Sequence, residues 1–547
     1  MGSSAARLAL WLSLLTLACA ASCNRSTDGS DGTLVLTLSS ESLAVTVGES
    51  VDVVITLKAN AALSAPVVMS VKGPADQALP TGIQATFDPM AATPAPDRPA
   101  NSRLRLVVGP TAVDDEYTLV VRAKGQRPGE DASGTLRLTI TGMATSWKRS
   151  IVTPGTEQIA ALASDYSGGV YAALYTDGAL AGGQNQGALD GYVLHYRNNG
   201  AVSFVQRFGT MSADIVAGLA SDRAGNVYVA GYTYGSFPGQ LPAGKADGFV
   251  AKLGSDGGLV WLTQLGTAEI DQLTSVVVDA DGAVYAAGQT EGAFPGHTNA
   301  GLSDVVVVKL RPDGSQEWIR QFGTDQKDRT DGVPDDRSVA LSLDAAGDVY
   351  VAGSTQGSFA GESSAGLGDA FVTRLDNTGK QIWLRQLGSV GNDAFLSLGP
   401  NPVGGVLAVG WARGPIAGQV QMGGQDALLV AFRPDGSRQF VRQIGTSYAD
   451  SFESLYVTDS NIYAIGSTRG AFPGQSLAGV QDAFLMRLGL DGSTIWLRQL
   501  GTPLFDRGTA IAMSDGLLHI AGTTFGSFDP ETMAMGSDGF LHQYPRE

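Results

Sequence analysis

Four short hydrophobic stretches separated by polar turns make up the segment that begins at Asp271. They read LTSVVVD, AVYAAGQT, DVVVVKL and SQEWIRQFG, and they are rich in the β-branched residues that strands favour. The turns within the first and the last pair are DADG and RPDG. Because Asp-Gly supplies the positive φ of tight hairpins, the pattern predicts four antiparallel strands in this segment.

The same pattern occurs seven times, as two independent markers indicate. An aromatic residue recurs every 57 residues, except for one interval of 65 and one of 56, and an Asp recurs just before the third predicted strand. Four short strands at this period are typical of a β-propeller blade, whereas a solenoid coil is shorter and a separate sandwich needs more residues. The aromatic markers are Trp147, Phe204, Trp261, Trp318, Trp383, Phe440 and Trp496, and the Asp markers are Asp190, Asp247, Asp304, Asp369, Asp426, Asp482 and Asp538.

The two ends of the repeat array complement each other. The last copy stops at DGFLHQYPRE, before its fourth strand, and the first copy begins with an unpaired fourth strand, ATSWKRSI. We therefore expect the strand around Trp147 to complete the sheet that contains Asp538, which removes an open sheet edge. The prediction is an all-β chain in which residues 144–547 form a seven-bladed β-propeller whose last blade is closed by the strand around Trp147.

Three stretches carry a resemblance to a known family: DRAGNVYVAGYTYGSFPG, DAAGDVYVAGSTQGSFAG and SDGFLHQY. They resemble the beta-propeller repeat family of bacterial exported proteins, and the likeness extends over all seven copies. The resemblance implies the fold and a frequent occurrence as lipoproteins or multidomain surface proteins. It implies no single activity.

Residues 33–142 follow a different pattern, with eight alternating, β-branched stretches bounded by turn residues. This number of strands in about 110 residues predicts a β-sandwich. The stretches GIQATFDP and TLRLTITG resemble bacterial Ig-like domains, and Tyr117 is similar to a tyrosine corner. The Cys…Trp…Cys set of antibody domains is missing, so the resemblance implies only the general architecture of an Ig-like domain.

The N-terminus predicts export. Arg7 precedes an apolar run from Leu8 to Leu17, which is too short to span a bilayer and is typical of a secretory signal. Ala20-Ala21-Ser22-Cys23 resembles a bacterial lipobox, although its first position is usually Leu, and ordinary cleavage after Ala20 is the alternative. We expect a signal peptide over residues 1–23, lipidation at Cys23, and a flexible tether over residues 24–32. By the same resemblance, Asn24 after the Cys favours an outer-membrane or cell-surface location.

The composition excludes some partners. The chain has 547 residues, 16% of them charged, and its formal net charge is −17. This charge argues against binding nucleic acid or an anionic membrane surface. We therefore expect membrane contact only through the lipid anchor, and a monomeric protein.

Candidate binding residues lie on one face of the expected ring. The connections after the second and fourth strands are long, as in GSFPGQLPAGKA, and such loops commonly hold binding residues. Both Asp series lie there, and they either form a ring of carboxylates for cations or a basic partner, or accept backbone N–H bonds that hold each turn. The series before the first strand contains Asp214, Asp271, Asp336, Asp393, Asp450 and Asp506, with Glu157 in the first copy.

One long insertion, Thr324 to Ser338, accounts for the interval of 65 residues. Carboxylate-rich loops can bind calcium through oxygen ligands, although the spacing is not that of an EF-hand and three basic residues dilute the charge. A solvated loop is the alternative. The calcium candidates are Asp325, Asp328, Asp331 and Asp335.

No catalytic motif is present, and the four histidines lack the spacing of a metal site, so strand-surface or loop positions are expected for them. We therefore expect no catalytic residues, no cofactor other than this possible calcium, and a non-enzymatic binding or scaffold protein of the cell envelope. Its partner would be an envelope protein or glycan. The alternatives are an extracellular hydrolase or lyase that acts on polysaccharide and a purely structural component of the cell surface. An enzyme would need polar residues unique to one or two copies, and the copies read as close to uniform.

Overall fold

The computed structural model describes residues 34–544, except for residues 47–49, 62, 64, 75–76, 81–82, 109–115, 142–146, 181–184, 329–338, 345, 417 and 529–535. The described residues form strands and no α-helix, so the all-β prediction is confirmed. None of their segments is a helix that could cross a membrane. The chain divides into two compact units, Met1–Gly142 and Met143–Glu547.

The first unit contains two sheets that share one apolar core. Their strands alternate buried and exposed residues, as in β4 (Val67–Lys72), so that Val67 and Met69 point into the core. One sheet has the order β1 (Leu34–Leu38), β3 (Ser50–Ala59), β7 (Ala100–Val108), β5 (Ile83–Asp88); the other has the order β2 (Ser42–Thr46), β9 (Asp131–Thr141), β8 (Glu116–Lys124), β4 (Val67–Lys72), β6 (Ala91–Ala92).

The described residues of the second unit form seven four-stranded antiparallel sheets, numbered here in chain order. Sheets 1 to 6 each use four consecutive strands. Sheet 7 consists of β35 (Asp506–Ser514), β36 (Leu517–Thr524), β37 (Asp538–Tyr544) and the much earlier strand β10 (Lys148–Ile151), which pairs with β37. Each sheet thus has the strand order of a β-propeller blade.

The strand bounds follow the repeat. Sheet 1 contains β11 (Glu157–Ser164), β12 (Val170–Thr176), β13 (Asp190–Tyr196) and β14 (Val202–Phe208); sheet 2 contains β15 (Asp214–Ser221), β16 (Val227–Thr233), β17 (Asp247–Leu253) and β18 (Leu259–Leu265); sheet 3 contains β19 (Asp271–Val278), β20 (Val284–Thr290), β21 (Asp304–Leu310) and β22 (Gln316–Phe322). Sheet 4 contains β23 (Val339–Leu343), β24 (Val349–Thr355), β25 (Asp369–Leu375) and β26 (Gln381–Leu387); sheet 5 contains β27 (Asp393–Pro400), β28 (Val406–Ala412), β29 (Asp426–Phe432) and β30 (Arg438–Ile444). Sheet 6 contains β31 (Asp450–Val457), β32 (Asn461–Thr468), β33 (Asp482–Gly489) and β34 (Thr494–Leu500); sheet 7 contains β35 (Asp506–Ser514), β36 (Leu517–Thr524), β37 (Asp538–Tyr544) and β10 (Lys148–Ile151).

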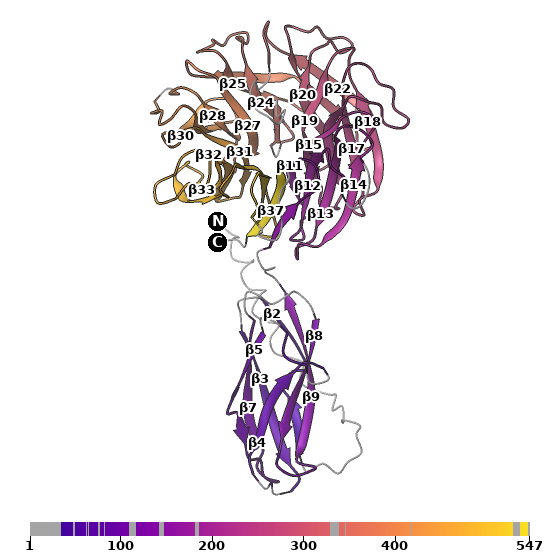
Figure 1. Cartoon of the computed structure of the whole chain (residues 1–547), viewed down its shortest axis with the longest axis vertical. Helices are drawn as coiled ribbons and strands as arrows, with labels where there is room; N and C mark the ends of the chain where they lie inside the picture. Colours follow the sequence, from indigo (N-terminus) through magenta and orange to yellow (C-terminus); the bar gives the residue numbers. More distant parts are fainter. Residues whose placement is uncertain are drawn as a thin grey trace, which may run out of the picture. The chain divides into compact units, whose positions relative to one another are not determined.

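The first strand of each sheet lies innermost. Each contacts the first strand of the next sheet, and β35 contacts β11, so these strands form a closed circle. Figure 1 shows β11, β15, β19, β27 and β31 near the centre and β14, β18, β22 and β30 at the outside. Neighbouring sheets cover both faces of the second strands, which explains why β16, β20 and β24 are buried along their whole length.

Aromatic markers of the repeat hold neighbouring sheets together, as Trp261 does. The Trp261 indole of sheet 2 donates a hydrogen bond from Nε1 to the carbonyl of Pro312 in sheet 3, at 3.0 Å. Its ring lies so close to Gly314 that a Cβ there would approach it to 2.7 Å. Gly314 also has a φ of 83°, which favours glycine. The Trp and the Asp-Gly turn therefore recur together because each contacts the other across a sheet boundary.

Candidate functional site

The third-strand Asp residues are buried and hold the loop that precedes them. Asp247 accepts hydrogen bonds from the backbone N–H groups of Ala243 and Gly244, at 2.8 and 3.1 Å, and from Gln264 Nε2 at 2.8 Å. In four other sheets, a Gln of the fourth strand donates a hydrogen bond to the corresponding third-strand Asp. These pairs are Gln321–Asp304, Gln386–Asp369, Gln443–Asp426 and Gln499–Asp482.

The first-strand carboxylates hold the connection from the previous sheet. Asp271 accepts hydrogen bonds from the backbone N–H and the hydroxyl of Thr267, at 2.5 and 3.0 Å. The same contacts recur at Asp214, Asp393, Asp450 and Asp506. Both Asp series therefore bind backbone donors below the surface, as the architectural alternative expects.

In sheet 4 the structure corrects the predicted residue of this series. Asp328, and not Asp336, accepts the backbone N–H of Thr324 at 2.5 Å and its hydroxyl at 2.9 Å, while its own N–H donates to the carbonyl of Ser303. Counting back from the first strand of sheet 4 suggested Asp336, because the residues of the long insertion were assumed to precede the carboxylate. They follow it instead, and Asp336 lies outside the described residues.

The calcium candidates are not brought together by the described structure. Asp325 is exposed, Asp328 is fully buried at the sheet boundary, and Asp331 and Asp335 lie outside the described residues, as does Cys23. Within the described part of the chain, no group of three or more His, Cys, Asp or Glu residues is arranged to hold a metal ion. Calcium binding by this loop stays a prediction.

Burial raises the pKa of the first-strand carboxylates. It raises the pKa of Asp328 and Asp393 to about 6 and that of Glu157 to about 7, against the effect of hydrogen bonds from Thr and Ser residues. The third-strand carboxylate of the preceding sheet adds to the effect, as Asp304 does for Asp328 and Asp538 for Glu157. At each boundary between sheets, on the face of the long connections, two carboxylates thus lie close together, and ionisation of both is disfavoured.

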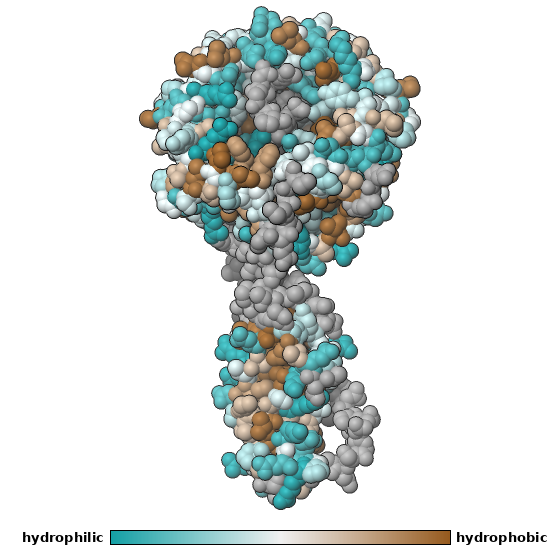
Figure 2. All heavy atoms as spheres, viewed as in Figure 1, coloured by the Kyte–Doolittle hydropathy of each residue, from teal (hydrophilic) through white to brown (hydrophobic). Residues whose placement is uncertain are grey.

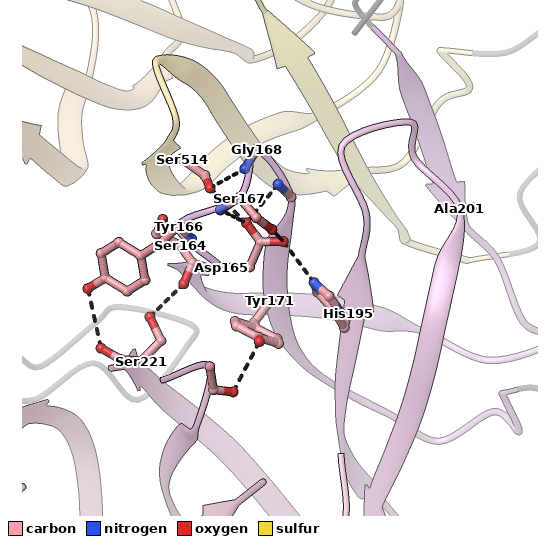
Figure 3. A network of polar contacts seen from close by, with 12 residues as sticks. Ser164, Asp165, Tyr166, Ser167, Gly168, Tyr171, His195, Ala201, Ser221 and Ser514 are labelled. Carbon is pink, nitrogen blue, oxygen red and sulfur yellow. Dashed lines mark hydrogen bonds and ion pairs between the residues drawn. The ribbon is translucent and has the colours of Figure 1, made fainter. Parts of the chain in front are cut away.

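The opposite face contains a polar network that joins sheets 1, 2 and 7 (Figure 3). Asp165 contacts His195 Nε2 at 3.0 Å and accepts the hydroxyl of Ser514 at 2.8 Å. Ser221 donates from its hydroxyl to the carbonyl of Ser164 at 2.6 Å. Burial acts to raise the pKa of Asp165, but hydrogen bonds from His195 and neighbouring serines outweigh it and lower the pKa below its usual range.

The ring of His195 in this Asp–His contact also packs against neighbouring aromatic residues. His195 stacks on Tyr171, with ring centroids 4.5 Å apart, and its Nδ1 has no hydrogen-bond partner in the described structure. The corresponding position in other sheets holds a cation over a Tyr, as Lys252 lies over Tyr228. His519 and His542 are also buried, at 0% and 1% exposure, so the expectation of strand-surface or loop positions was wrong for them.

The first strands enclose a central cavity of about 480 Å³. Hydroxyl groups link neighbouring first strands around it; Thr274 donates to the carbonyl of Val339, and Thr509 donates to that of Ile159. A β-bulge turns one residue of most first strands toward this cavity. The bulged residues that line it are Ala160, Ala217, Thr274, Leu396, Glu453 and Thr509.

Glu453 breaks the uniformity expected from the sequence. It is the one charged residue among the described residues that line the cavity, and its side chain is 4% exposed. Arg507 donates from Nη2 to Glu453 Oε2 at 2.8 Å, and Ser451 donates from its hydroxyl to Glu453 Oε1 at 2.8 Å. Other sheets form the same bulge with uncharged residues, so the fold does not require this buried ion pair.

Exposed apolar side chains are concentrated on the face of the long connections, called here the loop face. The opposite face contains the short turns and is called the turn face. Among the described large hydrophobic residues, only Tyr166 and Val403 are exposed on these short turns. Figure 2 shows hydrophobic residues in brown at several places on the ring, between hydrophilic ones. The fourteen described residues on the loop-face connections are Val152, Met211, Tyr234, Leu241, Leu302, Leu367, Val390, Val420, Met422, Tyr448, Val480, Leu504, Phe505 and Phe525.

The comparisons with known proteins support the repeat architecture. Residues 204–238 match the model of the beta-propeller repeat family. No curated protein matches the chain. The likeness to the repeat family is thus shown for one copy of the repeat.

Several solved structures are similar to the chain at low identity. A rhamnogalacturonan lyase of Bacillus licheniformis is 11% identical, covers 94% of this chain and 89% of its own, and gives a TM-score of 0.33. An apocarotenoid oxygenase mutant of Synechocystis is 10% identical, covers 81% of this chain and 95% of its own, and also gives a TM-score of 0.33. The SrpA adhesin of Streptococcus sanguinis is 11% identical, covers 34% of this chain and 94% of its own, and gives a TM-score of 0.18.

These similarities correct the expectation of a non-enzymatic protein. The two solved structures described above that align with most of the chain are enzymes, a lyase and an oxygenase. The buried Glu453–Arg507 pair also contradicts the uniform ring on which that expectation depended. At these identities and TM-scores, the similarities assign neither a reaction nor a substrate to this chain.

Proposed function

We propose that this chain is an exported, lipid-anchored cell-envelope protein that binds an envelope component through the loop face of its ring. The seven sheets would be the blades of one propeller closed by β10, the first unit would be an Ig-like sandwich over residues 33–142, and residues 24–32 would be a tether. The signal-like N-terminus and the lipobox-like Cys23 support export and anchoring.

The observation that carries the binding proposal is the difference between the two faces. Single exposed hydrophobic residues are normal on any protein, but here they concentrate on one set of connections and are nearly missing from the other. Leu241 is 89% exposed and Met211 is 88% exposed, so neither packs in the core. Apolar side chains kept in water on one face favour a binding surface.

Two experiments test this function. Wild-type protein should incorporate a labelled fatty acid in its native bacterium, and Cys23→Ser should not. Purified Cys23→Ser protein should bind isolated envelopes, and Leu241→Asp with Leu367→Asp on the loop face should weaken that binding, whereas Val403→Asp on the turn face should leave it unchanged. Equal binding by all variants would exclude the loop face as the binding surface.

A second candidate is an extracellular enzyme that cleaves polysaccharide, and one observation favours it. Glu453 places a carboxylate at a cavity, next to the donor group of Arg507, where other sheets have uncharged residues. Carboxylates act as acids, bases or nucleophiles in many glycan-cleaving enzymes. Purified protein should then release reducing ends or unsaturated ends from a polysaccharide, and Glu453→Gln should abolish the release.

A further inference from the structure

An aromatic pair is exposed where sheet 7 begins on the loop face. Phe505 is 40% exposed and Phe525 is 52% exposed, and their ring centroids lie 6.2 Å apart at an angle of 69°. The backbone N–H of Phe525 donates to the carbonyl of Phe505 at 2.9 Å, which holds the two positions side by side. Tyr448, 61% exposed, lies on the connection that enters sheet 6.

These aromatic residues are individual to this part of the ring. Phe505 precedes the first-strand carboxylate of its sheet, and Phe525 follows the Thr that ends the second strand. No other sheet has an aromatic residue at both positions. The residues before the carboxylate are Thr156, Ala213, Ile270, Lys327, Asn392 and Ala449, and those after the Thr, or after the residue that replaces it, are Asp177, Tyr234, Glu291, Gln356, Arg413 and Arg469.

A polar cluster lies beside the aromatic pair. Phe505 lies directly before β35 and Arg507 is the second residue of that strand, so alternation along the extended backbone places their side chains on the same side of sheet 7. Arg507 contacts Glu453, which also accepts the hydroxyl of Ser451. The hydroxyls of Ser451 and Ser467 lie 3.2 Å apart. Arg507 thus connects the segment that contains Phe505 with Glu453, which lines the cavity. Phe505, Phe525 and Arg507 themselves are not among the lining residues.

We propose that the boundary of sheets 6 and 7 binds an uncharged glycan, with Phe505 and Phe525 contacting a sugar ring and the Glu453–Arg507 pair binding its hydroxyl groups. This inference rests on the proposed function and names the ligand class of its loop face. Sugar rings combine apolar C–H faces, which pack on aromatic rings, with hydroxyls that both donate and accept hydrogen bonds.

Burial and charge favour this ligand over the others. The Glu453 side chain is 4% exposed, so a flat protein surface does not reach it, whereas a sugar unit can enter a cavity of about 480 Å³. The chain carries a net charge of −17, and the charged residue that lines the cavity is a carboxylate. Both disfavour an acidic polymer.

Affinity electrophoresis of the full chain with Cys23→Ser tests the proposal. Native gels would contain dextran, mannan, laminarin or xylan as uncharged probes, and alginate or polygalacturonate as anionic ones. We expect one or more uncharged polymers to retard the protein. Phe505→Ala and Phe525→Ala should each weaken this binding about tenfold, since each removes one aromatic contact.

Val403→Ala is the control, because Val403 is 65% exposed and lies on a short turn of the turn face, outside the proposed binding surface. It should bind as the wild type does. Glu453→Gln retains the side-chain size and should also weaken binding; a thermal-unfolding curve for each variant would separate lost binding from lost folding.

Three results would overturn the proposal: no retardation in any gel, retardation by anionic polymers alone, or equal retardation of the Phe505→Ala and Phe525→Ala variants and the wild type. Binding of isolated envelopes through the loop face, with any of these results, would leave the proposed function standing and reject the glycan site alone. If the Cys23→Ser protein did not bind isolated envelopes, both the proposed binding function and the glycan site would be rejected.

Discussion

Two Asp side chains, one on each face of the ring, have pKa values shifted in opposite directions. On the turn face, burial acts to raise the pKa of Asp222, but hydrogen bonds from Asn226, Tyr228 and Ala224 outweigh it and the pKa falls. On the loop face, burial raises the pKa of Asp271 although Thr290 and Thr267 donate hydrogen bonds to it. Asp222 therefore stabilises its hairpin as an anion, whereas the surroundings of Asp271 disfavour its ionisation.

The difference explains where the repeat can vary. On the loop face, the paired carboxylates and their backbone donors lie beneath the surface and hold the start of each sheet. The residues above them, such as Leu241 and Phe525, are free to differ from copy to copy. On the turn face, the turn itself is the contact between sheets, as at Gly314 and Trp261. Variation there would disturb the ring.

The largest expected effect comes from breaking a loop-face carboxylate. Asp247→Ala leaves the backbone N–H groups of Ala243 and Gly244 and the amide of Gln264 without their acceptor. We expect it to lower the free energy of unfolding by about 3 kcal/mol or more, measured by urea denaturation. Asp256→Ala, at an exposed turn, is the control and should cost less than about 1 kcal/mol. Similar losses for both variants would contradict the comparison.

The next effect is a pH dependence specific to the loop face. Burial raises the pKa of Glu157 to about 7, so the folded state favours its neutral form. The stability that this group contributes is complete below about pH 4.5 and is lost as the pH rises through 7, and the loss amounts to about 3 kcal/mol. Asp222, with its lowered pKa, loses its contribution only as the pH falls below about 4.

Glu157→Gln isolates this dependence. Burial lowers the pKa of His519 to about 4 and that of His542 to about 3, and these groups destabilise the fold as the pH falls below about 6.5. The wild-type curve therefore combines both effects, and the difference between wild type and variant is the informative quantity. Thermal unfolding at pH 5 and pH 7.5 should show the variant gaining stability relative to wild type at the higher pH. A difference independent of pH would exclude the raised pKa.

Two glycines with the same backbone conformation separate turn strain from contact between sheets. Gly314 and Gly347 both have a φ of 83°, but a Cβ at Gly314 would meet the Trp261 ring, whereas one at Gly347 would meet no atom within 4 Å. We expect Gly347→Ala to cost about 1 kcal/mol and Gly314→Ala about 2–3 kcal/mol in chemical denaturation. Equal costs would mean that the Trp contact adds nothing to the glycine requirement.

The sequence predicted the parts of this fold that repeat. The four strands, the Asp-Gly turns and the pairing of the Trp147 strand with the strand after Asp538 depend on local patterns and on counting copies. The placement of Asp328 could not be counted, because an insertion of unknown position has two alignments. The Glu453–Arg507 contact joins residues 54 positions apart on different sheets, and nothing in either strand alone indicates it.

The smallest expected effect on stability comes from the most exposed apolar residues of the loop face. Leu241 and Met211 are 89% and 88% exposed, so replacing them with Ser removes almost no buried surface. We expect Leu241→Ser and Met211→Ser to change the free energy of unfolding by no more than about 0.5 kcal/mol in urea denaturation. A loss above about 1 kcal/mol would mean that these side chains stabilise the fold. Their exposure would then no longer distinguish the loop face from the turn face as a binding surface. No loss would leave binding as the reason why these side chains remain in water.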